Sequence, residues 1–412
     1  MRRRSSTLCA AVLLTALATV SCVPAGRPTG VPGQAASGPG GPTRPAVLAF
    51  ADIAAPSIQH ADLPLPPKCT LEDYTDTLAA YTRMPEATHT TDAIGLLDLT
   101  TGSHSDVLVD AVNAAGRYDV FAPRLSDSVV AWEEVTPGEG DDMGHAGWCL
   151  YAATIDSRAL TMGRPTLVAE GRTEAVQRPF YGVDGSTVYW TSVASGAARG
   201  AGPVAADTVM ARVVAGGVPR VVHRSSAIID GFKLSSGVIV LTEARSVPTD
   251  GAASLLTAVA LRASDGRVLR SADLHNAFGL SHFADFADGW FVWTEYPAQG
   301  AEPSAYAMDP AGTVLFAGMS SVNPMASPGL AFFESRETTG SATARREVRI
   351  LRGLDLAKRT RFELARTVRD TDGAWHTTVA GGRPHTLVVY NDAWTTTEGP
   401  AAATTRVRVY RW

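Results

Sequence analysis

The stretch Gly289 to Glu295, G-W-F-V-W-T-E, is an apolar strand pattern that ends in polar residues. Six similar stretches occur elsewhere: Thr77 to Arg83, Ser128 to Glu134, Ser186 to Ser192, Gly237 to Glu243, Gly329 to Ser335 and Thr386 to Asp392. The fifth position is bulky in every copy: Tyr81, Trp132, Trp190, Leu241, Trp293, Phe333 and Tyr390. The copies are 40 to 58 residues apart, which is typical of β-propeller repeats stretched by loop insertions.

Turns on both sides of each copy define a four-stranded unit. Triplets such as Val183-Asp184-Gly185 and Ala287-Asp288-Gly289 precede the apolar strand, and these residue types favour tight hairpins. A first strand should therefore lie before each triplet. A polar connection, a third strand, a second turn such as Asp265-Gly266 and a short fourth strand follow. Serial four-stranded antiparallel units predict an all-β, seven-bladed β-propeller. The alternative is six blades, with the region before Ala93 as an unrelated extension.

The last unit lacks a fourth strand, because the chain stops at Trp412 inside the third one. A spare apolar strand, Ala46 to Ala51 (A-V-L-A-F-A), lies near the start of the folded region. We expect this N-terminal strand to complete the last blade and close the ring.

The first 22 residues have the features of an export signal. Arg2 to Arg4 form a charged start, and Leu8 to Val20 is an apolar run too short to span a bilayer. Thr19 to Cys22 (T-V-S-C) resembles a bacterial lipobox, which implies a lipidated Cys22. The alternative is ordinary cleavage after Ser21 and a secreted protein.

Residues 23–45 consist largely of Pro, Gly and small residues. Such a segment has too little apolar surface to fold and should be a disordered tether. We therefore expect a signal peptide over 1–22, a tether over 23–45 and a propeller over 46–412, anchored outside the cytoplasm to the cell membrane.

Composition limits the partners and the chemistry. The net charge of -5 argues against a nucleic-acid partner, which would need a basic face. We find no P-loop, G-x-S-x-G elbow or metal-ligand spacing, so we predict no cofactor, no metal and no catalytic residue. We expect a monomer.

Two cysteines remain after removal of Cys9 and acylation of Cys22: Cys69 and Cys149. In an oxidising compartment two such cysteines favour a disulfide. The bond would join the first blade to the second.

The turn-and-strand pattern in V-D-G-S-T-V-Y-W, A-D-G-W-F-V-W and S-P-G-L-A-F-F (residues 183–190, 287–293 and 327–333) resembles the repeats of TolB-like propellers. The resemblance covers residues 66 to 412 at the level of the fold. It implies a binding platform. No copy has the full S-P-D-G turn of that family.

Polar residues near the starts of six first strands are candidates for a ligand site at the mouth of the central channel: Lys68, Arg178, Asp230, His282, Asn323 and His376. They could bind an anionic or zwitterionic small molecule. The alternative is a water-filled channel whose polar walls satisfy one another. A second ring, at the ends of the apolar strands, contains Glu134, Glu243, Glu295 and Asp392. These residues could attract a cation, or be ordinary solvated strand ends.

The longest connections join second to third strands, and one propeller face should carry them all: Val135 to Gly147, Val193 to Ala206, Ala244 to Ser254, Tyr296 to Ser304, Arg336 to Arg346 and Ala393 to Thr404. They favour a binding or scaffolding module that docks an envelope protein or a glycan, with Trp148, Tyr296 and Trp394 as possible members of an exposed aromatic patch. The alternative is an enzyme acting on extracellular polysaccharide or peptide, with Asp230, His282 and His376 at the channel mouth.

Overall fold

The structure is a computed structural model. It describes residues 48–66, 69–83, 93–113, 119–135, 147–171, 178–193, 206–244, 256–274, 284–295, 302–319, 321–339, 346–368, 374–377, 385–392 and 406–412. Residues 48–412 form one compact unit. All regular secondary structure in the described residues is β-strand.

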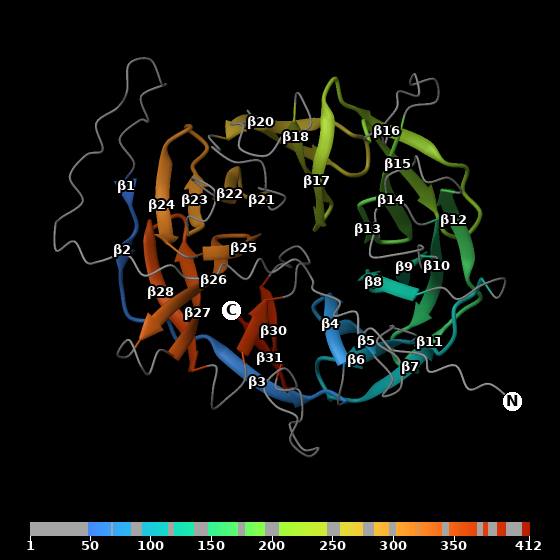
Figure 1. The fold of residues 1–412 in the computed structure, drawn as a ribbon, viewed down its shortest axis with the longest axis horizontal. Helices are drawn as coiled ribbons and strands as arrows, with labels where there is room; N and C mark the ends of the chain where they lie inside the picture. Colours follow the sequence, from blue (N-terminus) through green and yellow to red (C-terminus); the bar gives the residue numbers. More distant parts are fainter. Residues whose placement is uncertain are drawn as a thin grey trace, which may run out of the picture. The chain divides into compact units, whose positions relative to one another are not determined.

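Seven small antiparallel sheets form a ring, so the predicted seven-bladed propeller is confirmed and the six-bladed alternative is wrong (Figure 1). The strands of blades 1 to 3 are β4 (Cys69–Tyr74), β5 (Leu78–Arg83), β6 (Ala93–Asp98) and β7 (His104–Leu108); β8 (Asp119–Leu125), β9 (Val129–Val135), β10 (Trp148–Asp156), β11 (Thr161–Met162) and β12 (Thr166–Gly171); and β13 (Tyr181–Asp184), β14 (Thr187–Ser192), β15 (Thr208–Val213) and β16 (Arg220–Arg224). The region before Ala93, doubtful from sequence, supplies the first two strands of blade 1.

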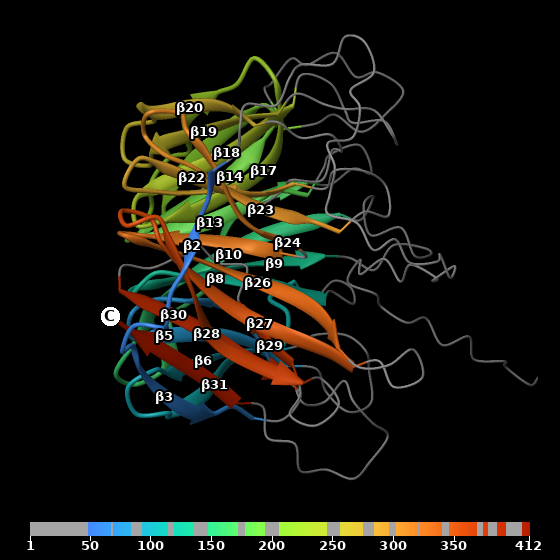
Figure 2. The same cartoon turned by 90° about the vertical axis from the view of Figure 1, so that its left-hand side faces the viewer.

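The other four blades follow the same plan. Their strands are β17 (Ile228–Ser235), β18 (Val238–Ala244), β19 (Leu256–Arg262) and β20 (Val268–Leu274); β21 (Ala284–Ala287), β22 (Trp290–Glu295), β23 (Ser304–Met308) and β24 (Val314–Met319); β25 (Ser321–Ser327), β26 (Leu330–Thr339), β27 (Arg346–Asp355) and β28 (Thr360–Val368); and β29 (Ala374–Thr377), β30 (Thr386–Asp392) and β31 (Arg406–Arg411). In every blade the first strand lies nearest the ring axis and the last lies outside (Figures 1 and 2).

The strand that closes the ring is β3 (Gln59–Pro64), which pairs antiparallel with β31 of blade 7. The prediction that Ala46 to Ala51 would do so is wrong. That region instead supplies β1 (Leu48–Ala49) and β2 (Ala51–Asp52), which pair in parallel with the outer edges of blades 5 and 6. An outermost strand has little to bury, and five of the six β3 residues are exposed. Its sequence therefore has no apolar pattern by which to recognise it.

Residues 48–66, which we call the strap, cross the outside of blades 5, 6 and 7 in turn. Apolar side chains of the strap enter each inter-blade core that it crosses. Phe50 is buried between blades 5 and 6, Ile58 packs between blades 6 and 7, and Leu65 is buried between blades 7 and 1. The strap therefore joins three successive blades as well as closing the ring.

The hydrophobic core consists of seven clusters, each between two neighbouring blades. In blades 1 to 6 the fifth residue of the apolar strand faces the preceding blade. Trp132 of blade 2, for example, packs with Leu78 and Ile94 of blade 1. Because successive strand residues point to opposite faces, the fourth and sixth residues face the following blade.

Blade 7 departs from the register read from the sequence by one residue. Leu387 and Val389 pack toward blade 6, whereas Val388 packs toward blade 1. The hairpin position taken by glycine in blades 4 to 6 is His385 here, with φ 60°. Val389, and not Tyr390, therefore corresponds to the fifth position, since a one-residue slip exchanges the two faces of a strand.

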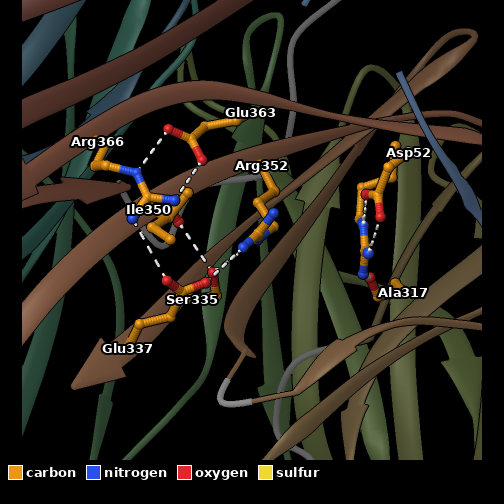
Figure 3. Close-up of polar contacts among 9 residues, drawn as sticks. Asp52, Ala317, Ser335, Glu337, Ile350, Arg352, Glu363 and Arg366 are labelled. Carbon is orange, nitrogen blue, oxygen red and sulfur yellow. Dashed lines mark hydrogen bonds and ion pairs between the residues drawn. The ribbon is translucent and has the colours of Figure 1, made fainter. Parts of the chain in front are cut away.

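Blade 6 has the longest hairpin, with 10 residues in β26 and 10 in β27. Charged side chains form a network along one face of it (Figure 3). Glu337 lies 2.7 Å from Arg352 and 3.4 Å from Arg366, and Arg366 makes a bidentate pair with Glu363 at 2.9 and 2.8 Å. Cross-strand ion pairs of this kind support a hairpin that extends beyond the core.

Candidate functional site

Four of the first strands carry a β-bulge where they pair with the second strand. The unpaired residues are Glu72 in β4, Ala122 and Pro123 in β8, Asp230 in β17, and Asn323 and Pro324 in β25. A bulge bends the strand and changes the direction of its side chains. Ala122 also has a positive φ of 44°. Glu72 and Asp230 are the polar residues at these bulges whose side chains are described, and both are half-buried.

Arg178, three residues before β13, binds Glu133 of blade 2 with two hydrogen bonds. Its Nε lies 2.9 Å from Oε1, and an Nη lies 2.6 Å from Oε2. The guanidinium also stacks over the Phe121 ring, 5.2 Å from its centroid. The Glu133 side chain is 3% exposed. Burial raises the pKa of this carboxyl above its usual range, and the Arg178 contact opposes that rise.

Tyr181 and Arg124 extend this cluster across three blades. The Tyr181 hydroxyl lies 2.7 Å from the carbonyl oxygen of Ala122 and donates to it. Arg124 donates to the carbonyl oxygen of Glu72 in blade 1 at 3.1 Å. Burial raises the pKa of Tyr181, whose surroundings include the charges of Glu133, Arg124, Arg178 and Glu72. Glu72, Arg124, Glu133, Arg178 and Tyr181 are the three-blade cluster named below.

Glu72 is the most accessible acid of the three-blade cluster. Its side chain is half-buried and accepts a hydrogen bond of 3.0 Å from the Thr82 hydroxyl. Burial raises the pKa of Glu72, and the Arg124 charge partly offsets it. A carboxyl of this kind can exchange protons nearer neutral pH than an ordinary glutamate can.

Blades 4 to 6 are joined by a second set of charges at the axis. The ammonium of Lys233 in β17 lies 2.8 Å from Asp285 in β21 and donates to the carbonyl oxygen of Pro324 in β25 at 3.1 Å. Asp285 also accepts the backbone N–H of Ala326 at 2.8 Å. Asp73 of blade 1 makes the equivalent contact with the backbone N–H of Leu125 in blade 2, at 2.7 Å. Aspartates on first strands therefore fasten one blade to the next.

The structure describes only part of the six-residue ligand site predicted from the sequence. Lys68 and His282 lie outside the described residues. Only the backbone of Asn323 and His376 is described: Asn323 lies in the bulge of β25, and His376 pairs with Tyr390 of β30. Arg178 is paired with Glu133, and Asp230 is half-buried in its bulge. The ligand site stays a prediction.

The predicted ring of strand-end carboxylates is not a uniform surface. Glu134 is fully buried and accepts the backbone N–H groups of Val112 and Asn113 at 2.7 and 3.0 Å. Glu243 lies 3.4 Å from His223, and Glu295 is buried. Only the backbone of Asp392 is described. Glu134 and Glu295 are therefore interior groups and not solvated strand ends.

The predicted disulfide between Cys69 and Cys149 is absent from the structure. Cys69 lies in the core between blades 7 and 1, whereas Cys149 lies in the core between blades 1 and 2. The sheet of blade 1 separates the two thiols. Cys69 is in blade 1 and Cys149 in blade 2, as expected, but the face toward which Cys69 points excludes the bond. Burial raises the pKa of Cys69 to about 12.

The possible aromatic patch is not borne out where it can be seen. Trp148 is buried between blades 2 and 3, and Tyr296 and Trp394 lie outside the described residues. The tips of all six long connections also lie outside them. In the described ranges, no three His, Cys, Asp or Glu side chains lie close enough together to hold a metal ion. The described part of the chain has no helix with the length and apolar character needed to span a bilayer.

Sequence reasoning missed the sixth position of the repeat. In blades 1 to 6 this residue is polar and buried: Thr82, Glu133, Thr191, Thr242, Thr294 and Glu334. Glu133 pairs with Arg178, and Glu334 lies 2.7 Å from Arg349. The aligned copies show a polar residue at this position in all six blades. It was missed because a polar residue directly after an apolar run is usually interpreted as an exposed strand end.

No protein-family model matches the chain, and no curated protein matches it. Solved structures similar to it include TolB from Acinetobacter baumannii, with 14% identity and a TM-score of 0.36, over 61% of this chain and 55% of that one. The β-propeller domain of the Trilobed protease from Pyrococcus furiosus matches with 10% identity and a TM-score of 0.45, over 80% and 93% of the two chains. The Dos1 propeller matches with 9% identity and a TM-score of 0.40, over 83% and 78%. At these identities the likeness concerns the fold alone.

Proposed function

We propose that this chain is a binding or scaffolding propeller outside the cytoplasm, which docks an envelope protein or a glycan at the rim where second strands end. The observation that carries the proposal is the pairing of the axial charges across blades. Glu133 with Arg178 and Asp285 with Lys233 hold neighbouring blades together. Groups engaged in this way maintain a rigid ring, whereas a general acid or base must be available to a substrate.

A rigid ring is well suited to present variable loops. Loops on a fixed scaffold are the usual location of binding residues, and the six long connections all start from second strands. Buried acids at the ends of second strands, such as Glu133 and Glu334, support this proposal because they fix the strands from which the loops start.

The test is chemical cross-linking of intact cells, followed by purification of the full chain and identification of its partners. Residues 136–146 would be replaced by an equally long Gly-Ser segment. The matched control replaces residues 28–38, which have the same length, in the tether. We expect one partner that is lost with the first replacement and kept with the second. A partner kept with both replacements would contradict docking at this part of the rim.

Membrane anchoring through Cys22 is a separate part of the proposal. It is supported by the lipobox-like Thr19 to Cys22 and by the Pro- and Gly-rich segment that follows. Replacement Cys22→Ala should move the protein from the detergent phase to the aqueous phase in a phase-partition assay. Equal partitioning of the two forms would contradict lipidation.

A further inference from the structure

Among the described residues, the strap covers the outer wall of the propeller along blades 5, 6 and 7. The strap adds β1 to β24, β2 to β28 and β3 to β31, so blades 5, 6 and 7 each gain an outer strand. The strap is held by backbone hydrogen bonds, such as that from Ile53 to the carbonyl oxygen of Arg361 at 2.8 Å, and by the Asp52–Arg361 ion pair (Figure 3). Outer strands of this ring therefore accept a further extended strand.

On blades 3 and 4 the outer strands are β16 and β20, and no described strand pairs with their outer edges. Both strands expose apolar side chains. Val221 in β16 is 42% exposed, Val268 and Leu269 in β20 are 50% and 40% exposed, and Val218 before β16 is 84% exposed. A bare edge strand with apolar side chains is a template for strand pairing, and clustered exposed apolar residues mark interaction surfaces.

The two edges form one continuous surface. Arg220 of β16 donates to the carbonyl oxygen of Ser264 in blade 4 at 3.0 Å. Gly266, in the turn before β20, lies so close to β16 that a Cβ there would meet the Val222 carbonyl oxygen. In Figure 1, β16 and β20 lie on the outer wall away from β1 and β2.

This surface is basic on an otherwise acidic chain. The exposed charged side chains of residues 212–224 and 262–274 are Arg220, Arg224, Arg262 and Arg267, against Asp265 and Asp273. The whole chain has a net charge of -5. Charge complementarity therefore favours an acidic occupant. The strap shows the same chemistry on blade 6, where its Asp52 binds the edge arginine Arg361.

We infer that the outer edges of β16 and β20 bind an extended, acidic and apolar segment of a partner protein by strand addition. The backbone of the segment would pair with a bare edge, its apolar side chains would cover Val221 or Leu269, and its carboxylates would lie near Arg224 or Arg267. Main-chain pairing supplies affinity in such complexes, and alternate side chains supply specificity. This surface is separate from the rim and goes beyond the proposed function.

The probe is a labelled peptide with the sequence of residues 46–55, A-V-L-A-F-A-D-I-A-A, part of which this ring holds as strands on other blades. Its binding to the full chain would be measured by fluorescence anisotropy. We expect a peptide with Asp52→Lys to bind at least tenfold more weakly. A peptide with Phe50→Pro should not bind, because proline cannot join the ladder.

The matching changes in the protein are Arg224→Glu with Arg267→Glu, both on the exposed surface. We expect this variant to bind the acidic peptide at least tenfold more weakly and to prefer the lysine peptide. The control is Lys358→Glu with Arg406→Glu, which makes the same charge change on blades 6 and 7 and should leave binding unchanged.

A photo-reactive group at the Phe50 position of the peptide locates the contact. Cross-links to residues 218–224 or 264–272 are expected, and cross-links confined to blades 5 and 6 would mean that the peptide displaces the strap, which overturns the inference. Equal binding of the acidic and lysine peptides would overturn it as well. The inference would also be overturned if the same arginines bound anionic lipid vesicles, or made the chain dimerise, without any preference between the peptides. Replacement of residues 136–146 should not affect the peptide, so failure at the rim and failure here can be told apart.

Discussion

The inner and outer walls of this ring contain similar ion pairs in different surroundings. On the inner wall, Lys233 lies 2.8 Å from Asp285, whose side chain is 0% exposed. On the outer wall, Arg361 lies 2.7 Å from Asp52, whose side chain is 70% exposed. The distances are alike, but water screens the outer pair and not the inner one. Distance alone therefore does not show which charges hold the propeller together.

The replacement Asp285→Ala should have the largest effect. It leaves Lys233 partly buried without this carboxylate and removes the acceptor of the Ala326 N–H. Breaking a buried pair from one side costs about 3 to 5 kcal/mol. Asp52→Ala on the outer wall should cost about 1 kcal/mol or less. The measurement is the midpoint of urea unfolding for both variants, and equal losses would remove the distinction between the walls.

The replacement Phe50→Ala tests whether the strap contributes to the outer wall through burial and not through charge. Phe50 is 4% exposed in the core between blades 5 and 6. Truncation of a buried phenylalanine costs about 3 kcal/mol or more. The matched change Ile53→Ala, at a strap residue that is 46% exposed, should cost less than about 0.5 kcal/mol. Thermal melting of both variants would measure this, and similar melting points would contradict it.

The replacement Arg178→Ala tests the inner-wall pair Glu133–Arg178 through the pH dependence of the free energy of unfolding. Burial raises the folded-state pKa of Glu133, so its protonated form is favoured and stability falls as pH rises through that pKa. Arg178 opposes the rise. In Arg178→Ala the loss of unfolding free energy relative to the unchanged protein should therefore be larger at pH 8, about 2 kcal/mol, than at pH 5. Arg178→Lys, which keeps a charge, should restore part of the difference. A loss that is the same at both pH values would show that Arg178 acts by packing on Phe121 alone.

The sequence was sufficient for the features that repeat. Apolar strands such as Gly289 to Glu295 recur because each inter-blade core needs them, and the glycine turns of blades 3 to 6 recur because these hairpins contain a positive φ. In this way the seven blades were predicted correctly, although His385 replaces the usual glycine in blade 7 and shifted its reading by one residue.

Features that occur once were not predictable in this way. The strand β3 has an exposed sequence, Q-H-A-D-L-P, that shows no apolar period, and the apolar Ala46 to Ala51 was a more convincing but wrong closing strand. The prediction of a Cys69–Cys149 disulfide was wrong for a related reason. Sequence gives the strand of each cysteine, but the face toward which a side chain points depends on a register shift such as the one at Glu72. The axial pairs Glu133–Arg178 and Asp285–Lys233 join residues that are far apart in the sequence, and only the packing of neighbouring blades brings them together.

The smallest expected effect is that of Asp62→Asn on the closing strand β3. Arg408 of β31 binds this carboxylate at 2.5 and 2.8 Å, and that hydrogen bond lowers the pKa of Asp62 below its ordinary value of 3.8. Stability from a lowered pKa is present above the ordinary value and is lost as pH falls through the folded-state value. Because the Asp62 side chain is 34% exposed, solvent screening should keep the contribution below about 1 kcal/mol. Asp62→Asn should therefore lower the melting temperature slightly at pH 7 and should have no effect once the wild-type carboxyl is protonated. A deficit of equal size at low pH would mean that the introduced amide disturbs the pairing of β3 with β31, and that the ring is closed by strand register more than by charge.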